Sequence, residues 1–435
     1  MSEPVLITGH GWVSPLGNSN GAENEAARIF EKNLFSGFSA VQSRSIELPG
    51  QSSVSLAVAQ VEFNHSNIHS HSKVPLDRGT AMALSAAKDA LIAAGLATRK
   101  PLIDGGPTHP SEAEIEINFQ GVDPTRVGVF WGSGMAGAYS FDQTAEMLYH
   151  QQKRIRPTSV VTIMPNSAAA ELALLIKAQG TCMTYSCACA SSAVAMGEAL
   201  RALRAGWLDV ALVGGSEAML SPGVLASWNA LRVLSPVKDD ARNACRPFAK
   251  DRSGFALGEG AGAFILERSG HAAKRGVTSK LELRGYASNC DATHMTLPDA
   301  AGQVRAMNAA LQDAHLSAKD IGYVNAHATA TIAGDAAEVG SVTEILGQDV
   351  PISSTKGQFG HMLGAAGALE MIVSLKALEH QTIPPNAHLS TELVDPSFNL
   401  NFVGTKGSPQ VLKHALSNSF AFGGTNAVLI ASLVD

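Results

Sequence analysis

One cysteine stands where its surroundings could make it reactive. Residues 182–207, CMTYSCACASSAVAMGEALRALRAGW, are typical of a strand, a sharp turn and a helix that begins near Ser191. Cys189 lies at the turn, where the N–H groups and the dipole of a helix N-terminus stabilise a thiolate over a thiol. Taken alone, the segment still fits an inert cysteine in an Ala-rich core better than a nucleophile. Cys189 therefore needs partners before chemistry can be assigned to it.

The second half of the chain supplies such partners. His327 lies just after an expected strand in VNAHATAT, and His361 follows another expected strand, PISSTK, whose last residue is Lys356. Open α/β sheets place their active sites at strand ends of this kind. Each residue alone is a common core residue. Two histidines and a lysine at strand ends, together with a cysteine at the strand end of the other half, predict nucleophilic catalysis.

Two further patterns give weaker evidence, one for a dinucleotide-binding turn and one for a metal site. Residues 132–137, GSGMAG, match the GxGxxG turn of dinucleotide-binding proteins, but no acidic residue follows at a second strand end about 20 residues later, so a tight turn is the better interpretation. His65, His69 and His71 in HSNIHSHS could hold a metal, yet a Ser- and Asn-rich stretch is typical of a solvated loop. We predict no metal site and no cofactor.

Apolar runs that suit strands alternate with Ala- and Leu-rich helical stretches, which predicts parallel strands joined by helices. Strands are expected within residues 5–9, 126–134, 208–219, 260–267, 281–289, 321–327, 350–356 and 415–433, and helices within 77–96, 167–180, 302–316, after Gly334, and 365–380. The weaker second cycle predicts two α/β halves, residues 1–270 and 271–435. Residues 97–123, rich in Pro, Gly and acids, are expected to form a long surface loop.

Composition excludes several classes of protein. The 435 residues are 45% hydrophobic and 16% charged, with a net charge of -6 and no run of Lys and Arg interleaved with aromatics, so nucleic acid is not an expected partner. No apolar run reaches the roughly 18–20 residues of a membrane span. The N-terminus lacks signal-peptide features, so we expect a cytoplasmic protein. Five cysteines without CxxC spacing indicate reduced thiols.

At this point the motifs resemble a known family, the elongating β-ketoacyl-acyl-carrier-protein (ACP) synthases of the synthase II type, over nearly the whole chain. The supporting blocks are CACASSAVAMGEAL, GGSEAML, RPFAKDRSGFALGEGAG, NAHATATIAGDAAE, SSTKGQFGHMLGAAGALE and NSFAFGGTN. The Cys-His-His arrangement differs from the Cys-His-Asn arrangement of the initiating synthases. The resemblance implies a thiolase-like fold, in which two similar α/β halves form a layered α-β-α-β-α sandwich.

The resemblance also implies a mechanism. Cys189 would take an acyl group from its carrier protein as a thioester, with the N–H groups of Cys189 and Phe422 as the oxyanion hole. His327 and His361 would stabilise the enolate formed when malonyl-ACP loses carbon dioxide, and the resulting carbanion would attack the acyl group. Lys356, paired with Glu338, would orient His361, and Asp335 would support the same segment.

Substrate and partner residues follow from the same resemblance. The residues expected at the substrate are Met135, Phe420, Phe422, Thr329 and Thr331, and those expected at the acidic carrier protein are Lys153, Arg154 and Arg232. Ala421 replaces the usual Gly between the two gate phenylalanines, Ala328 replaces a Gly after the first histidine, and the 97–123 loop is longer than usual. These departures also suit a specialised polyketide or aryl-polyene pathway.

Alternatives belong to other functional classes. A silent partner of a ketosynthase, like the chain-length factors, would lack the cysteine, and a degradative thiolase would carry a second cysteine near its C-terminus, but none follows Cys290. We expect either a homodimer or a heterodimer with a chain-length-factor-like subunit.

Overall fold

A mixed sheet runs through the centre of the computed structural model, which describes residues 3–19, 25–47, 53–64, 68–100, 115–119 and 121–434. Its eleven strands follow the order β15-β13-β12-β17-β18-β11-β1-β10-β8-β6-β7. The strands from the first half of the chain are β1 (Val5–Val13), β6 (Val127–Gly132), β7 (Cys182–Tyr185), β8 (Val210–Glu217) and β10 (Gly260–Arg268). Those from the second half are β11 (Leu281–Cys290), β12 (Tyr323–Asn325), β13 (Pro351–Ser353), β15 (Asn401–Phe402), β17 (His414–Phe420) and β18 (Thr425–Leu433). Each half of the chain thus builds one half of the sheet, which supports, as a proposal, a division near residue 270.

The prediction of parallel strands is only partly correct. β6 runs parallel to β7 and β8, and β12 runs parallel to β13 and β17. By contrast, β10 is antiparallel to both β1 and β8, and β18 is antiparallel to β11 and β17. Only residues 421–424 join β17 to β18, which is too short for the crossover that a parallel pair requires. The alternation of strands and helices along the chain could not reveal these reversals.

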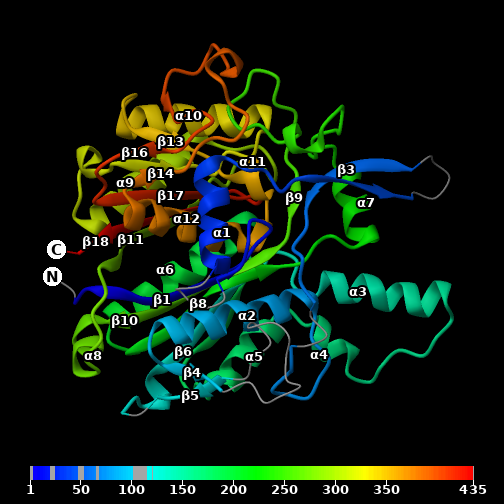
Figure 1. Cartoon of the computed structure of the whole chain (residues 1–435), viewed down its shortest axis with the longest axis vertical. Helices are drawn as coiled ribbons and strands as arrows, with labels where there is room; N and C mark the ends of the chain where they lie inside the picture. The colour runs from blue at the N-terminus through cyan, green and yellow to red at the C-terminus, as the bar shows by residue number, and fades with distance from the viewer. Residues whose placement is uncertain are drawn as a thin grey trace.

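Helices cover both outer faces and fill the middle (Figure 1). α2 (Arg78–Ala93) and α5 (Ser167–Ile176) cover the sheet half made by the N-terminal strands, whereas α9 (Ala300–Ala314) and α10 (Ile332–Leu346) lie outside the other half. Between the two halves lie α6 (Ser191–Arg204) and α12 (Ala366–His380), and residues 366–378 are all buried. From bottom to top, Figure 1 shows helix, sheet, helix, sheet and helix, as the family resemblance implied.

The middle helices consist largely of small residues because sheet strands press on both of their sides. A Cβ atom added at Gly197 of α6 would lie 2.2 Å from the ring of Tyr286, a buried residue of β11. Only a glycine therefore fits at this crossing of helix and strand. The remaining helices are α1 (Glu25–Ser36), α3 (Ala138–Ala145), α4 (Ser159–Ile163), α7 (Pro222–Ala230), α8 (Ser269–Lys274) and α11 (Lys356–Phe359).

The expected loop at residues 97–123 carries some regular structure. β4 (Ala97–Arg99) pairs antiparallel with β5 (Ile115–Ile117), whereas residues 101–114 and 120 lie outside the described part of the chain. The other short strands are β2 (Gln42–Ile46), β3 (Val54–Ala59), β9 (Leu257–Gly258), β14 (Thr382–Ile383) and β16 (Ser408–Pro409). The three-residue strands β4 and β5 give too short a pattern for recognition from sequence.

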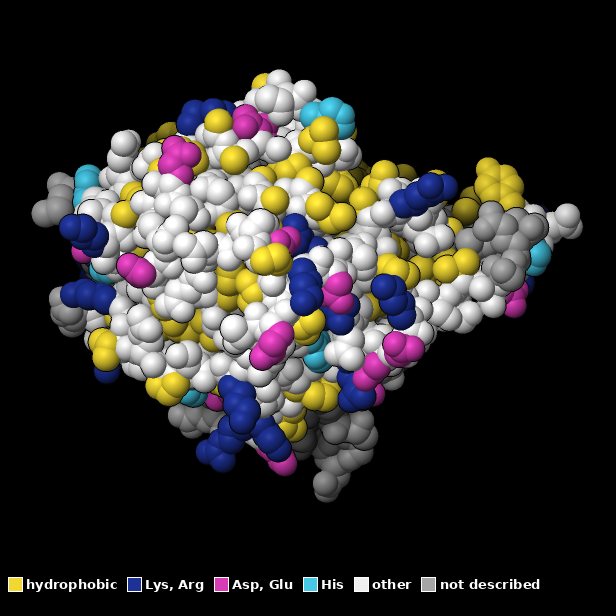
Figure 2. All heavy atoms as spheres, turned by 90° about the horizontal axis from the view of Figure 1, so that it is seen from above, with side chains coloured by type: hydrophobic (Ala, Val, Ile, Leu, Met, Phe, Trp, Pro, Cys, Tyr) yellow, Lys and Arg dark blue, Asp and Glu magenta, His cyan; other side chains and the backbone are white. Residues whose placement is uncertain are grey.

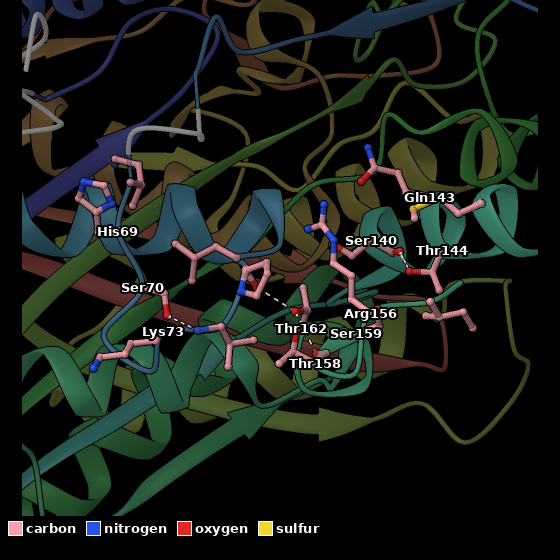
Figure 3. Close-up of a pocket in the computed structure, with 16 residues that line it drawn as sticks. His69, Ser70, Lys73, Ser140, Gln143, Thr144, Arg156, Thr158, Ser159 and Thr162 are labelled. Carbon is pink, nitrogen blue, oxygen red and sulfur yellow. Dashed lines mark hydrogen bonds between the residues drawn. The ribbon is translucent and has the colours of Figure 1, made fainter. Parts of the chain in front are cut away.

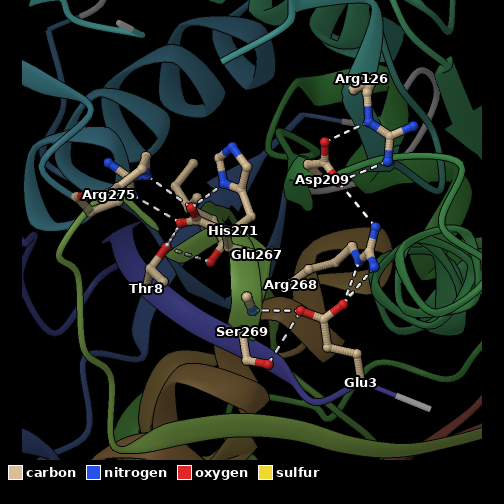
Figure 4. Close-up of polar contacts among 12 residues, drawn as sticks. Glu3, Thr8, Arg126, Asp209, Glu267, Arg268, Ser269, His271 and Arg275 are labelled. Carbon is tan, nitrogen blue, oxygen red and sulfur yellow. Dashed lines mark hydrogen bonds and ion pairs between the residues drawn. The ribbon is translucent and has the colours of Figure 1, made fainter. Parts of the chain in front are cut away.

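A chain of ion pairs ties together four strand ends (Figure 4). Arg126, just before β6, pairs with Asp209, just before β8, at 2.5 Å. Arg268 at the end of β10 contacts both Asp209, at 3.2 Å, and Glu3, at 2.6 Å, just before β1. Since β6 and β8 are parallel, these residues mark the sheet edge opposite to the carboxyl ends of those strands. The network fixes strand positions and leaves the other edge free for chemistry.

The surface agrees with the charge pattern of the sequence. On the face shown in Figure 2, Lys and Arg side chains lie among Asp and Glu side chains and exposed apolar groups, so this face carries no continuous basic field. Among the described residues, no helix combines the length and apolar character needed to cross a bilayer.

Two glycine variants test the packing of the middle layer. Gly197→Ala should destabilise the fold by about 1–3 kcal/mol, because overpacking against Tyr286 exceeds the helix propensity gained. Gly340→Ala is the matched control, since nothing lies within 4 Å of a Cβ added at this position in α10. It should raise stability by about 0.5–1 kcal/mol. Equal melting temperatures for the two variants would contradict the packing argument.

Candidate active site

Three residues that are far apart in sequence meet in one buried cluster. Cys189 lies in a three-residue turn, Ala188–Ala190, directly before α6, His327 follows β12, and His361 follows α11. One ligand-type atom from each of the three lies within 4.8 Å of the others. The His361 Nε2 atom is 3.0 Å from the Cys189 sulfur, and the two imidazole rings are 5.4 Å apart and nearly perpendicular. The expected grouping of cysteine and histidines therefore exists in the fold.

The turn that carries Cys189 is shaped by the backbone of Ala188 and held by the side chain of Ser191. Ala188 has a φ of 47°, in the left-handed region, and so bends the chain between β7 and α6. The Ser191 hydroxyl donates to Ala188 O at 2.7 Å and accepts from Cys187 N at 2.9 Å. These contacts direct the thiol toward the strand ends of the other half of the sheet.

The predicted stabilisation of a Cys189 thiolate by backbone N–H groups is opposed by burial of the sulfur. Burial raises the pKa of Cys189 to about 12, although Lys356 and the N–H groups of Phe422 and Cys189 act in the opposite direction. The free-energy cost of removing the thiolate charge from water exceeds the stabilisation that these groups give. The resting side chain is a thiol, so a base must take its proton when it reacts.

Both histidines are neutral for the same reason. Burial, followed by the nearby Lys356 cation, lowers the pKa of His361 well below 6.5. The pKa of His327 is also lowered well below 6.5, by burial first, then by Lys356 and His361. The Nδ1 atom of each ring is buried and has no hydrogen-bond partner among the residues that the structure describes. A neutral imidazole beside a thiol can accept its proton, and a neutral imidazole N–H can donate to a carbonyl oxygen.

Lys356 is fully buried and pairs with Glu370, not with Glu338 as the resemblance implied. Its Nζ atom bonds Glu370 Oε1, and Glu370 lies on α12, fourteen residues further along the chain. Glu370 is the acid that sequence reasoning missed. The available signal was its position as a lone acid within the apolar stretch of residues 366–375, since a buried acid requires a partner.

Glu338 binds backbone N–H groups and a side-chain amide, and does not pair with Lys356. Its carboxylate accepts hydrogen bonds from His327 N at 2.9 Å, Ala328 N and Asn418 Nδ2, so it holds the backbone that carries His327. Burial raises the pKa of Glu338 to about 7. Asp335 is also buried; it accepts from Phe248 N at 2.8 Å, and burial raises its pKa to about 6. Both acids therefore support the segment, as expected of Asp335.

Cys189, His327 and His361 line a cavity of about 310 Å³. Four of the five residues expected at the substrate line the same cavity: Thr329, Thr331, Phe420 and Phe422. Sequence reasoning missed several other lining residues, namely Trp228, Leu231, Phe255, Asp291, Gln303 and Asn426. These residues come from loops, helices and the start of β18, and their approach to the cysteine depends on the tertiary fold.

Met135 does not line this cavity. Trp228 does, and its Nε1–H points to the Met135 sulfur at 3.4 Å, so the indole separates Met135 from the cavity. The Trp228 ring also stacks on Phe422, with ring centres 6.4 Å apart. Ala421, the departure in the gate segment, has no positive φ, whereas Gly423 and Gly424 do. Alanine is therefore unstrained at position 421 in this conformation.

The basic residues expected at a carrier protein are exposed. Lys153 and Arg154 follow a π-helical turn at the end of α3, and Arg232 follows α7. The two regions are connected, since Asp142 of α3 accepts from Gly223 N of α7 at 2.8 Å. Their role stays a prediction.

A second pocket, of about 620 Å³, lies between residues 68–76, α3 and α4, and contains none of the three clustered residues (Figure 3).

The remaining sequence patterns have simpler explanations. Of the histidine-rich stretch, His69 and His71 are exposed, and His65 lies outside the described residues. The GSGMAG turn binds the carboxylate of Glu217 through its own N–H groups, so a protein side chain fills the position that a phosphate would need.

Comparisons with known proteins agree with this geometry. Residues 2–272 match the family described as Beta-ketoacyl synthase, N-terminal domain, and residues 281–390 match Beta-ketoacyl synthase, C-terminal domain. The chain belongs to the β-ketoacyl synthase family. It is 33% identical to 3-oxoacyl-[acyl-carrier-protein] synthase 2 of Staphylococcus aureus, over 98% of this chain and 97% of the relative. It is 38% identical to the chloroplastic synthase II of Arabidopsis thaliana, over 77% of this chain and 61% of the relative.

Solved structures support the same fold for this ketosynthase. A β-ketoacyl synthase from Burkholderia phymatum shares 30% identity over the full length of both chains, with a TM-score of 0.84. A ketosynthase in complex with its chain length factor from Xenorhabdus doucetiae shares 26% identity, covers 99% of this chain and 98% of its own, and gives a TM-score of 0.80. The predicted thiolase-like fold class is thereby confirmed.

The neutral state of the histidines can be tested by nuclear magnetic resonance. In protein with isotope-labelled histidine, the ring signals of His327 and His361 should remain those of neutral imidazole from pH 7.5 down to about 6, because burial disfavours their charged forms; a free imidazole titrates near 6.5. His327→Gln and His361→Gln variants assign the signals. Titration of either ring near pH 6.5 would contradict the electrostatic argument.

Proposed function

We propose that this ketosynthase condenses an acyl group, held as a thioester on Cys189, with a malonyl group carried by ACP, releasing carbon dioxide and β-ketoacyl-ACP. The observation that carries the proposal is the 3.0 Å contact between the Cys189 sulfur and His361 Nε2, with His327 beside them in one cavity. A thiol and two neutral imidazoles are the groups that this two-step reaction needs.

In the first step, Cys189 attacks the carbonyl carbon of an acyl thioester. His361 Nε2 accepts the thiol proton as the sulfur forms its new bond, and this proton leaves with the carrier's released thiol. The N–H groups of Cys189 and Phe422, which already lower the pKa of the sulfur, are the proposed donors to the developing oxyanion. The product is an acyl group on Cys189.

In the second step, the malonyl thioester enters past Thr329 and Thr331. His327 donates a hydrogen bond to its thioester oxygen, and His361 donates a second one in the tautomer that carries its proton on Nε2 and not on Nδ1. The electron pair of the breaking carbon–carboxylate bond is thereby held as an enolate. The enolate carbon then attacks the acyl carbonyl and the carbon–sulfur bond to Cys189 breaks. Cys189 leaves as a thiolate that takes a proton from solvent, the one proton that the overall condensation consumes. Burial favours loss of the carboxylate as uncharged carbon dioxide.

Lys356 is proposed as an electrostatic element and not a nucleophile. Its cation pairs with Glu370. Burial is the main cause of the lowered pKa of both histidines, and the Lys356 cation acts in the same direction. A second cation in the Cys-His-His cluster would face this charge, which argues against a metal there although the ligand types would suit one.

We propose a dimer as the working form. β7 ends the order of the large sheet and exposes Met183, and other exposed apolar side chains of the first half of the chain include Phe141, Tyr149 and Val160. An open strand edge with exposed apolar groups favours pairing with another chain. Solved neighbours include a ketosynthase/chain length factor pair, and both a homodimer and such a heterodimer fit these features. The presence of Cys189 and both histidines argues against a silent partner.

The pathway is proposed only as a choice between two classes. Curated relatives are named for acyl-carrier-protein substrates, and one solved neighbour is a type II polyketide acyl-carrier protein in complex with its ketosynthase bound to a hexaketide. Fatty acid synthesis and specialised polyketide or aryl-polyene assembly therefore both stay open, and the cytoplasmic location stays a prediction.

Active-site variants separate the two steps. Cys189→Ala should abolish formation of β-ketoacyl product. Cys189→Gln, a neutral mimic of the acylated side chain, should still release carbon dioxide from malonyl-ACP, whereas His327→Ala should not, because it lacks the enolate donor. The measurements are product formation by mass spectrometry and release of labelled carbon dioxide. An undiminished rate in Cys189→Ala would refute the function.

Charge reversal tests the carrier patch. Lys153→Glu combined with Arg154→Glu should raise KM for malonyl-ACP about tenfold, a loss of about 1.4 kcal/mol in binding, without changing kcat. The control, Lys274→Glu with Lys319→Glu, makes the same change of charge at exposed lysines outside the cavity and should leave KM unchanged. Equal KM values for the two double variants would remove this surface from the proposal.

A further inference from the structure

One buried carboxylate near the cysteine has no part in the proposed reaction. Glu217 is the last residue of β8, with a relative exposure of 1%. Its oxygens accept from Gly134 N at 2.6 Å, Met135 N at 3.2 Å, Ser133 Oγ at 3.1 Å and Gly364 N at 3.1 Å. Four donors from two separate segments thus converge on one side chain.

The first segment is the GSGMAG turn after β6. The Ser133 hydroxyl accepts from Ala136 N at 2.9 Å, which leaves its hydrogen available for Glu217. Met135, whose N–H binds the carboxylate, in turn contacts the Trp228 indole that lines the cavity. The carboxylate is therefore connected through this turn to one wall of the cavity.

The second segment carries His361. Gly364 lies three residues after His361, and Leu363 between them lines the cavity. The two segments are pressed together, since a Cβ atom added at Gly364 would lie 2.1 Å from Gly134 N and 2.6 Å from Glu217 Oε2. The carboxylate thus fills a junction where only glycines allow the backbones to approach.

We propose that Glu217 is a positioning residue, which fixes His361 and the Met135–Trp228 wall of the cavity relative to Cys189. This inference rests on the proposed function, because it concerns the same cysteine. A carboxylate suits the site because it accepts several hydrogen bonds and donates none, whereas a glutamine amide would direct two donors at backbone N–H groups. Burial raises the pKa of Glu217 to about 7, which is the cost of holding this acceptor away from water.

Glu217→Gln is the main test, with acylation of Cys189 followed by intact mass in single turnovers. We expect acylation to slow about 10- to 100-fold, because displacement of reacting groups by about 1 Å has effects of this size. The ratio of rates for a short and a long acyl-ACP should change by about fivefold, since the Trp228 wall moves with the turn. This ratio does not depend on how much of the variant is folded.

Glu171→Gln is the matched control. Glu171 is also a buried carboxylate that binds a loop, accepting from His71 N at 2.9 Å and Ser70 Oγ at 3.0 Å, but none of its partners lines the cavity of Cys189. It should keep both the acylation rate and the chain-length ratio within about twofold of the parent. Parent-like values in Glu217→Gln as well would overturn the proposal.

Two further arms keep the result decisive. If Glu217→Gln does not fold, Ser133→Ala removes one of the four donors and should change the ratio by more than Glu171→Gln changes it. A change no larger than that of the control would count against a positioning role. Peptide mapping of the acyl group in the parent enzyme tests the function separately. Acylation at a residue other than Cys189 would refute the proposed function, whereas acylation at Cys189 with an unaltered Glu217→Gln would refute only the role of Glu217.

Discussion

The buried ion pair between Lys356 and Glu370 is the interaction on which the rest of the site depends. Both side chains are almost completely removed from water, where an unpaired charge would be very costly. Because Glu370 sits on the middle helix α12 and Lys356 sits just after β13, the pair also joins two layers of the fold. Its cation contributes to the lowered pKa of both histidines. Chemistry at the cysteine therefore depends on a contact that never touches the sulfur.

The same fold uses carboxylates to organise backbone near the cavity. Glu338 binds the N–H groups of His327 and Ala328, and Glu217 binds N–H groups of the GSGMAG turn and of Gly364. Each is buried, and burial raises the pKa of each to about 7. Loop backbone has unpaired donors that strands and helices do not, and an internal acceptor satisfies them without admitting water. The site is thus preorganised by acids that do not take part in the reaction.

Burial has opposite consequences for the nucleophile and for its base. It raises the pKa of Cys189 to about 12 and lowers the pKa of His361, so a neutral thiol faces a neutral imidazole. Thiolate attack then requires proton transfer within the site, over the 3.0 Å that separates the two atoms. A resting thiol is also less prone to unwanted oxidation or alkylation than a thiolate.

The motifs of the sequence, through the family resemblance that they carry, determined the layered fold class, the grouping of Cys189, His327 and His361, and four of the five residues expected at the substrate. Short motifs at strand ends carry these features. The sequence did not determine strand direction, which depends on pairing between distant segments. It assigned the wrong partner to Lys356, and it missed Glu370 as that partner and Trp228 as a residue that lines the cavity. It also expected a thiolate, since a helix N-terminus is visible in sequence while burial is not. Only the tertiary structure decided these points, because desolvation and the choice of ion-pair partner depend on which layers close over a side chain.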